Sequence, residues 1–118
     1  MRTPEENEQF VREHWANVAL EDHRECCGRF DPFRVVIDSK ELWHGPWCAY
    51  LEEAWAAAAE FTEHRMEEIR QVEMEIALLR GLLFLLSAEP GDLTAPIWER
   101  VIVREQAALE SLKKGMRL

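Results

Sequence analysis

The fold is decided by one long helical segment, residues 46–88, which reads PWCAYLEEAWAAAAEFTEHRMEEIRQVEMEIALLRGLLFLLSA. Pro46 suits the first turn of a helix, where its missing N–H removes no hydrogen bond, and Gly45 interrupts whatever precedes it. No further proline occurs before Pro90, and the segment contains a single glycine, Gly81. Because Ala, Glu, Leu, Met and Arg dominate this segment, it predicts one continuous helix roughly 60 Å long.

Two shorter helices are expected beside the long one. The first covers residues 4–27 and opens with Thr3 as its N-cap, Pro4 in its first turn and a glutamate that completes a capping box. The other covers residues 95–114, after a turn rich in proline and glycine. We therefore expect a mainly α fold, in which helices 4–27 and 95–114 pack antiparallel along the central helix 46–88.

Apolar residues of the central helix recur every three or four positions, as in a coiled-coil seam. In its second half they are Met66, Ile69, Val72, Ile76, Leu79, Leu83 and Leu86. With only one short helix beside each half, much of the long helix would stay uncovered in a monomer. We therefore expect a homodimer or a covering partner protein.

The segment between the first two helices has a different pattern. Residues 33–37 are aromatic or β-branched, which predicts a short strand. After them, residues 38–40 either turn the chain into a second strand at 41–43 or cap one helical turn that ends at Gly45. The sequence thus predicts a short β-hairpin or a turn at 33–44.

Length and charge restrict the class of protein. With 118 residues, the chain is expected to form a single helical domain, 1–118. Its net charge is -9, and residues 1–88 hold 18 acidic and 9 basic side chains. An acidic surface repels phosphate, so direct binding to nucleic acid or to an anionic membrane is disfavoured and a basic protein partner is favoured.

The sequence also indicates a compartment. Residues 1–9 are polar, and the most apolar run, 81–86, is too short to span a bilayer. The three cysteines do not suggest a disulfide framework. We expect a cytoplasmic protein.

A pattern of histidine and cysteine suggests a zinc site. His23 and Cys26 form one pair, and His44 and Cys48 form another after the predicted hairpin. Thiolate sulfur and neutral imidazole are good zinc ligands, and four of them complete a tetrahedron. Such a closed site would hold the hairpin between two helices and leave no position for catalysis. The alternative is that the cysteines pack in the core and no metal or other cofactor is bound.

The acidic side chains of the long helix indicate the function. We expect a non-enzymatic protein-binding module, an adaptor or inhibitor, that contacts its partner through carboxylates and nearby tryptophans. The expected contacts are Glu52, Glu53, Glu60, Glu63, Glu67, Glu68, Trp43 and Trp47. One concrete form is a phage or mobile-element inhibitor of the anti-CRISPR or antirestriction sort, whose carboxylates replace the phosphates of nucleic acid against a basic protein.

An enzyme is the less favoured class. Glu60 and His64 lie four residues apart, so a small metal-dependent hydrolase built on helix carboxylates is a further alternative. However, the Glu-x-x-His pairing typical of metal sites in helical bundles is absent there, because residue 61 is phenylalanine. The sequence also has no Gly-x-Ser-x-Gly nucleophile motif and no glycine-rich phosphate loop.

Overall fold

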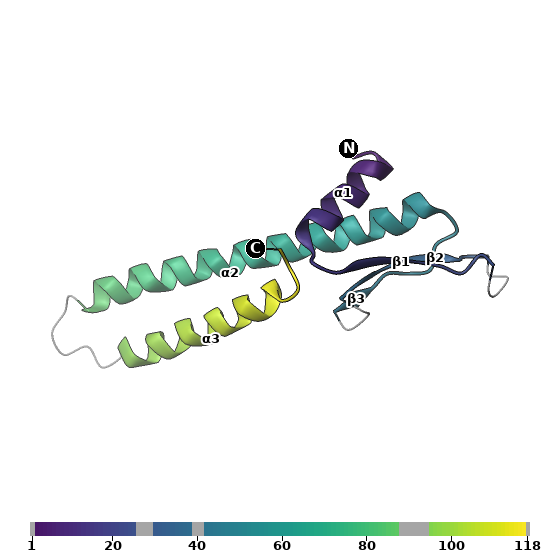
Figure 1. Cartoon of the computed structure of the whole chain (residues 1–118). Coiled ribbons are helices and arrows are strands. Elements are labelled where there is room, and N and C mark those ends of the chain that lie inside the picture. Colours follow the sequence, from purple (N-terminus) through teal and green to yellow (C-terminus); the bar gives the residue numbers. More distant parts are fainter. Residues whose placement is uncertain (1, 26–29, 39–41, 88–94, 118) are drawn as a thin grey trace. The chain divides into compact units, whose positions relative to one another are not determined.

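The computed structural model describes residues 2–25, 30–38, 42–87 and 95–117, which are mostly helical with a small antiparallel sheet (Figure 1). The elements are α1 (Pro4–His14), β1 (Val18–Asp22), β2 (Phe33–Ile37), β3 (Trp43–His44), α2 (Leu51–Ser87) and α3 (Ala95–Lys113). They fall into two compact units: a first unit of Met1–His64 with Gly115–Leu118, and a second unit of Arg65–Lys114. The predicted mainly helical class, with three helices among the described residues, is confirmed.

Helix α1 begins as predicted but ends early. Thr3 Oγ1 accepts a hydrogen bond from the Glu6 N–H at 3.2 Å, and the Glu6 carboxylate accepts one from the Thr3 N–H, which forms the capping box. The helix ends at His14, and Trp15 is extended and pairs with Met116. The prediction of a helix over 4–27 is therefore wrong for residues 15–25, and its last two residues, 26 and 27, lie outside the described residues.

Strand β1 stands where the second half of that helix was expected, because β2 supplies it with a hydrogen-bonding neighbour. The two strands are antiparallel, with Val18 opposite Ile37 and Asp22 opposite Phe33. Val18 and Leu20 both pack against the core, as expected for alternating residues of a strand. The spacing from Trp15 to Val18 also fits a helical stripe, which concealed this alternation.

The sheet has the strand order β1-β2-β3. The predicted strand over 33–37 is confirmed as β2. Strand β3 pairs antiparallel with it, with Val36 opposite His44 and Ile37 opposite Trp43. The turn of the predicted hairpin falls partly on residues 39–41, which lie outside the described residues.

Helix α2 begins five residues later than predicted. Cys48 lies on extended backbone, where its N–H donates to the Phe33 carbonyl at 2.6 Å and its carbonyl accepts the Phe33 N–H at 3.1 Å. Because this bridge continues the sheet, the helix starts only at Leu51, and Pro46 is not in its first turn. The predicted last residue, Ala88, lies outside the described residues.

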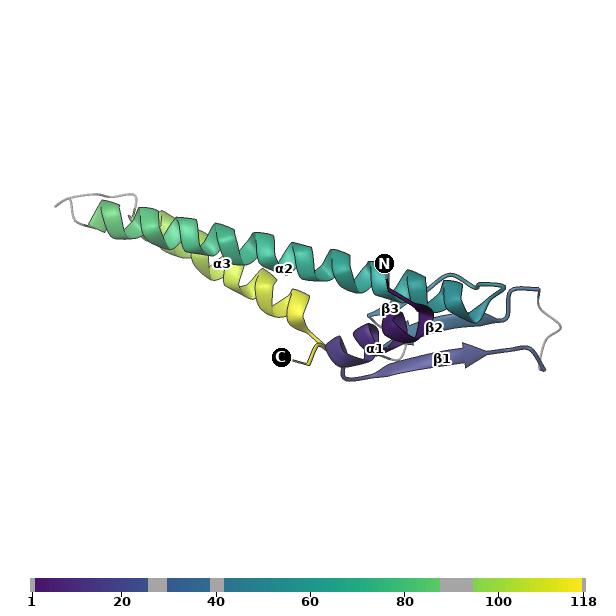
Figure 2. The same cartoon turned by 90° about the horizontal axis from the view of Figure 1, so that it is seen from above.

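The core of the first unit lies where α1 and the sheet flank the beginning of α2 (Figures 1 and 2). Trp15 is fully buried there, and its indole N–H donates to Thr62 Oγ1 at 2.9 Å. The other buried members come from α1, β2 and α2, with one from the loop after β3; they are Val11, Phe33, Val35, Ile37, Cys48, Ala54, Trp55, Ala58 and Ala59. Three alanines in this list allow the backbone of α2 to approach the sheet closely.

The C-terminal residues complete the first unit. The Gly115 carbonyl accepts the Ala16 N–H at 2.9 Å, and the Arg117 N–H donates to the His14 carbonyl at 2.9 Å. Gly115 has a φ of +84°, a conformation that glycine adopts without steric cost. The end of the chain thus provides hydrogen-bonding partners for the backbone between α1 and β1.

The second unit consists of the rest of α2 and of α3, which lie side by side in both views (Figures 1 and 2). Ile69, Ile76 and Ile102 are buried in this unit. Arg65 donates to the Leu112 carbonyl at 3.1 Å, and Lys113 Nζ lies 3.9 Å from Glu73 Oε1. Both contacts join the C-terminal part of α3 to α2.

Candidate protein-binding surface

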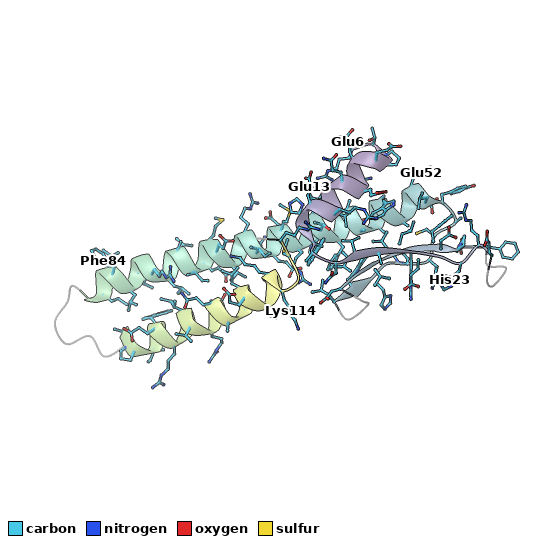
Figure 3. The ribbon with its side chains drawn as sticks, in the orientation of Figure 1. Glu6, Glu13, His23, Glu52, Phe84 and Lys114 are labelled. Carbon is cyan, nitrogen blue, oxygen red and sulfur yellow. The ribbon has the colours of Figure 1, made fainter. Side chains whose placement is uncertain are left out.

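The six glutamates expected to contact a partner are divided between the two units. Glu52, Glu53, Glu60 and Glu63 belong to the first unit and are exposed on α2. Figure 3 shows Glu52 near the start of this helix, with Glu6 and Glu13 on α1. The other two, Glu67 and Glu68, belong to the second unit, where Glu67 is exposed and Glu68 is partly buried.

These carboxylates differ in whether they already have a cationic neighbour. Glu63 pairs with Arg2, and Glu67 pairs with Arg70 at 2.6 Å. The hydrogen bond from Arg70 lowers the pKa of Glu67. In contrast, Glu52, Glu53 and Glu60 form no ion pair with any described residue. These three are referred to below as the open carboxylates.

The two tryptophans expected at the surface are both partly buried. Trp43 stacks on Phe61 with ring centroids 4.7 Å apart, and Phe61 in turn stacks on Trp15. Trp43 therefore packs against the core of the first unit. Trp47 lies 4.7 Å from the His23 ring and 4.4 Å from the Arg34 guanidinium, as measured to its ring centroid. Their contact with a partner stays a prediction.

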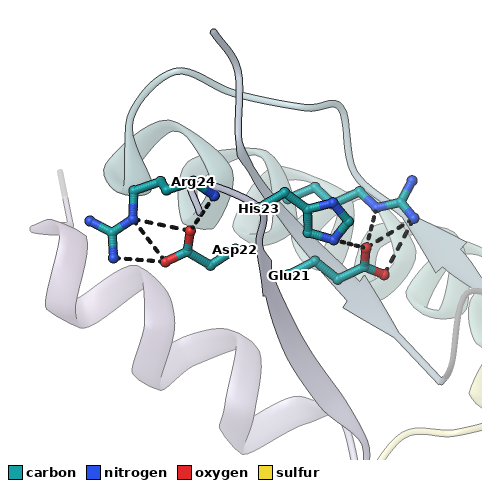
Figure 4. Close-up of polar contacts among 5 residues, drawn as sticks. Glu21, Asp22, His23 and Arg24 are labelled. Carbon is teal, nitrogen blue, oxygen red and sulfur yellow. Dashed lines mark hydrogen bonds and ion pairs between the residues drawn. The ribbon is translucent and has the colours of Figure 1, made fainter. Parts of the chain in front are cut away.

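A polar cluster on β1 and β2 contains residues that the sequence did not single out. Arg34 donates to both oxygens of Glu21, at 3.2 and 3.3 Å, and the two side chains are only 14% and 19% exposed. His23 Nε2 lies 3.5 Å from Glu21, as drawn in Figure 4. This two-point contact is the strong form of an ion pair, and it links the two strands at a cross-strand pair.

A second ion pair lies beside this cluster. Asp22 accepts hydrogen bonds from the side chain and the backbone N–H of Arg24, which lower the pKa of Asp22 (Figure 4). Every charged group in Figure 4 therefore has an opposite charge in contact. These contacts therefore stabilise this end of the sheet.

The proposed zinc ligands are placed as follows. His23 contacts Glu21 and Trp47, and His44 is exposed on β3. Cys48 is buried, its thiol donates to the Pro46 carbonyl at 3.4 Å, and burial raises its pKa. Cys26 lies outside the described residues. Within the described ranges, no group of three or more His, Cys, Asp or Glu could hold a metal ion, so the four-ligand zinc site stays a prediction.

Sequence reasoning missed Glu21 and Arg34 for one reason. The sequence predicts a helix over residues 4–27, and a residue of a helix has no cross-strand partner. The contact between Glu21 and Arg34 therefore could not be predicted. The one available signal is that Val18 and Leu20 alternate with Ala19, as residues of a strand do. A strand here would place a glutamate across from a basic residue of the neighbouring strand.

No protein-family model, no curated protein and no solved structure matches this chain. Among the residues described, none of the helices has an apolar stretch long enough to cross a lipid bilayer. The function must therefore be argued from the surface itself.

Proposed function

We propose that this chain is a non-enzymatic protein-binding module whose partner is a basic protein that binds nucleic acid. The open carboxylates Glu52, Glu53 and Glu60 form the contact. The observation that carries this proposal is that all three are exposed on one helix and have no cation beside them among the described residues.

The charge of the first unit supports the choice of a basic partner. This unit has fourteen acidic and seven basic residues, whereas the second unit has nine and seven. A carboxylate without an internal cation attracts a basic surface without first breaking an ion pair. Glu63 and Glu67, which are already paired, are expected to contribute less than the open carboxylates.

The specific form of the proposal is an inhibitor that occupies a nucleic-acid site. Exposed carboxylates carry negative charge, as phosphates do. They can therefore bind to a basic groove of the partner that normally holds nucleic acid. An anti-CRISPR or antirestriction protein from a phage or mobile element is an inhibitor of this kind. The cytoplasm is the compartment in which such an inhibitor would meet its target.

The proposal includes an arrangement for the helices. We propose that α3 runs antiparallel to the second half of α2 as a helical hairpin. The contacts of Arg65 with Leu112 and of Glu73 with Lys113 support it, because both join the last turns of α3 to α2.

Affinity capture tests the proposed function. The immobilised chain is exposed to a nuclease-treated bacterial lysate, and bound proteins are eluted with salt and identified by mass spectrometry. Raising the ionic strength from about 0.15 M to about 1 M shortens the Debye length from about 8 Å to about 3 Å, so a carboxylate contact should be released. We expect basic nucleic-acid-binding proteins in the eluate, and competition by added DNA.

The decisive comparison uses two variants of equal net charge. E52Q/E53Q/E60Q removes the open carboxylates, whereas E25Q/D31N/E99Q removes three exposed carboxylates that lie outside α2. We expect the first variant to capture at least about tenfold less protein than the wild type, because complementary charges steer and stabilise association. The control should bind as the wild type does. Equal capture by both variants would contradict the proposed surface.

A further inference from the structure

The second unit has a groove between α2 and α3 with a volume of about 630 Å³. On α2 it is lined by Glu73, Ala77 and Arg80, and on α3 by Val103, Ala107 and Glu110. Ile76, which is 6% exposed, also lines it, whereas Val103 is 64% exposed. The groove therefore presents apolar and small residues in its middle and charged residues near its ends.

A hairpin of two helices cannot cover all its apolar surface. Leu78, Phe84 and Leu85 of α2 are 72%, 75% and 67% exposed, in addition to Val103. Of these four residues, Val103 lines the groove, and exposed apolar side chains at a groove are common where proteins associate. Ala77 and Ala107 leave room for another helix to approach closely, because interaxial distance depends on side-chain size at the contact.

The charges along the groove indicate which partner binds there. Lys113 lies beside Glu73, so the end of the groove with Glu73 also holds the C-terminal turns of α3, including Glu110. Arg80 lies seven residues further along α2, which is about two turns or roughly 10 Å. One end of the groove is thus acidic and the other is basic.

We infer that this groove binds the same groove of a second copy of this chain. A two-fold axis near Ala77 places Glu73 of each copy against Arg80 of the other, because the two residues lie on either side of that alanine at similar distances. A two-fold interface uses the same patch on both copies, so the pair forms twice. A parallel arrangement would instead bring like charges together.

The rest of the second unit permits this association. Its nine acidic and seven basic residues nearly balance, so the second units of two copies repel each other only weakly. Glu73 also has the intrachain neighbour Lys113, but at 3.9 Å this contact is loose, and its carboxylate has a second oxygen. The dimer is a four-helix assembly with α2 and α3 from each copy.

This inference does not depend on the proposed function, because it uses residues of the second unit only. Sedimentation equilibrium of the full chain at about 100 µM should give twice the mass of one 13.8 kDa chain, since interfaces of this kind reach micromolar affinity or better. A monomeric wild type at this concentration overturns the inference and leaves the groove to a helix of another protein.

Charge reversal tests the register of the dimer. R80E and E73R each place like charges at both contacts of a homodimer, so each should dimerise at least about tenfold more weakly than the wild type. Mixed together, they restore two opposite-charge pairs and should form a heterodimer. Both residues lie on the helix surface, and circular dichroism verifies that each variant is folded. If each variant dimerises as the wild type does, or if the mixture forms no heterodimer, this register is wrong.

Discussion

At the scale of single residues, Trp15 has the most consequential polar contact. Its indole N–H donates to Thr62 Oγ1, which itself donates to the Ala58 carbonyl at 2.8 Å, and both side chains are fully buried. A buried N–H that loses its acceptor is removed from water without a compensating hydrogen bond, which destabilises the folded state. This chain of hydrogen bonds fixes the tryptophan between the end of α1 and α2.

Replacing Thr62 by valine tests this contact. Thr62→Val keeps the shape of the side chain but removes the acceptor for the indole N–H, and it should lower the free energy of unfolding by about 1–3 kcal/mol. Urea unfolding followed by tryptophan fluorescence measures the change. Thr62→Ser keeps the hydroxyl and should cost less. A valine variant as stable as the wild type would show that the hydrogen bond contributes nothing.

Glu105 gives the second unit a dependence on pH. The hydrogen-bonding Glu75 carboxyl raises the pKa of Glu105 above its ordinary value of 4.5. The folded chain therefore holds this proton more tightly than the unfolded chain does. The stabilisation is present in full below about pH 4.5 and is lost as the pH rises through the folded-state pKa.

Glu105→Gln should remove this dependence, because glutamine resembles the protonated carboxyl. The variant should melt at a higher temperature than the wild type at about pH 7 and at a similar temperature at about pH 4. Thermal melts by circular dichroism across this range measure the difference. Glu99→Gln, an exposed residue of the same helix, is the control. Parallel changes in the two variants would rule out a specific carboxyl pair.

At the scale of the elements, the glycine inside α2 is not required by packing. A Cβ built on Gly81 meets no atom within 4 Å outside the backbone of its own helix. Gly81→Ala should therefore raise the free energy of unfolding by about 0.5–1 kcal/mol, because glycine loses more backbone freedom on folding. Gly115→Ala is the contrasting control: with a φ of +84° it should cost about 1–2 kcal/mol.

Chemical denaturation of both variants measures these opposite changes. If Gly81→Ala destabilised the chain, the glycine would be needed for a bend or for a close contact with another molecule.

The elements differ in how well sequence alone could predict them. The capping box of α1, strand β2 and helix α3 depend on local signals, and the sequence located them within a residue or two. The end of α1 and the start of α2 depend on distant backbone partners. Trp15 pairs with Met116, and Cys48 pairs with Phe33. Such pairings are decided by tertiary structure, which outweighs local propensity.

The candidate site follows the same division. That α2 has an acidic surface could be read from the spacing of its glutamates. Which of these glutamates lack a neighbouring cation could not be predicted, because Arg2, which pairs with Glu63, is sixty-one residues away in the sequence. The Glu21–Arg34 contact was also inaccessible, since it requires the register of β1 on β2.

At the scale of the whole molecule, the two units have different surfaces. The first unit holds most of the net negative charge, and the second unit exposes apolar side chains beside a nearly balanced set of charges. We therefore propose that the first unit binds the partner and that the second unit associates with a second copy of the chain. Variants of one surface should leave the other function intact.

Native mass spectrometry tests the central claim most directly. The wild-type chain and E52Q/E53Q/E60Q are each mixed with the protein recovered by affinity capture, and the masses of the intact complexes are measured. Our account predicts a wild-type dimer that binds the basic protein, and a variant dimer without it. A wild-type chain that forms no complex with the captured protein, or a variant that retains the same protein, would contradict the claim.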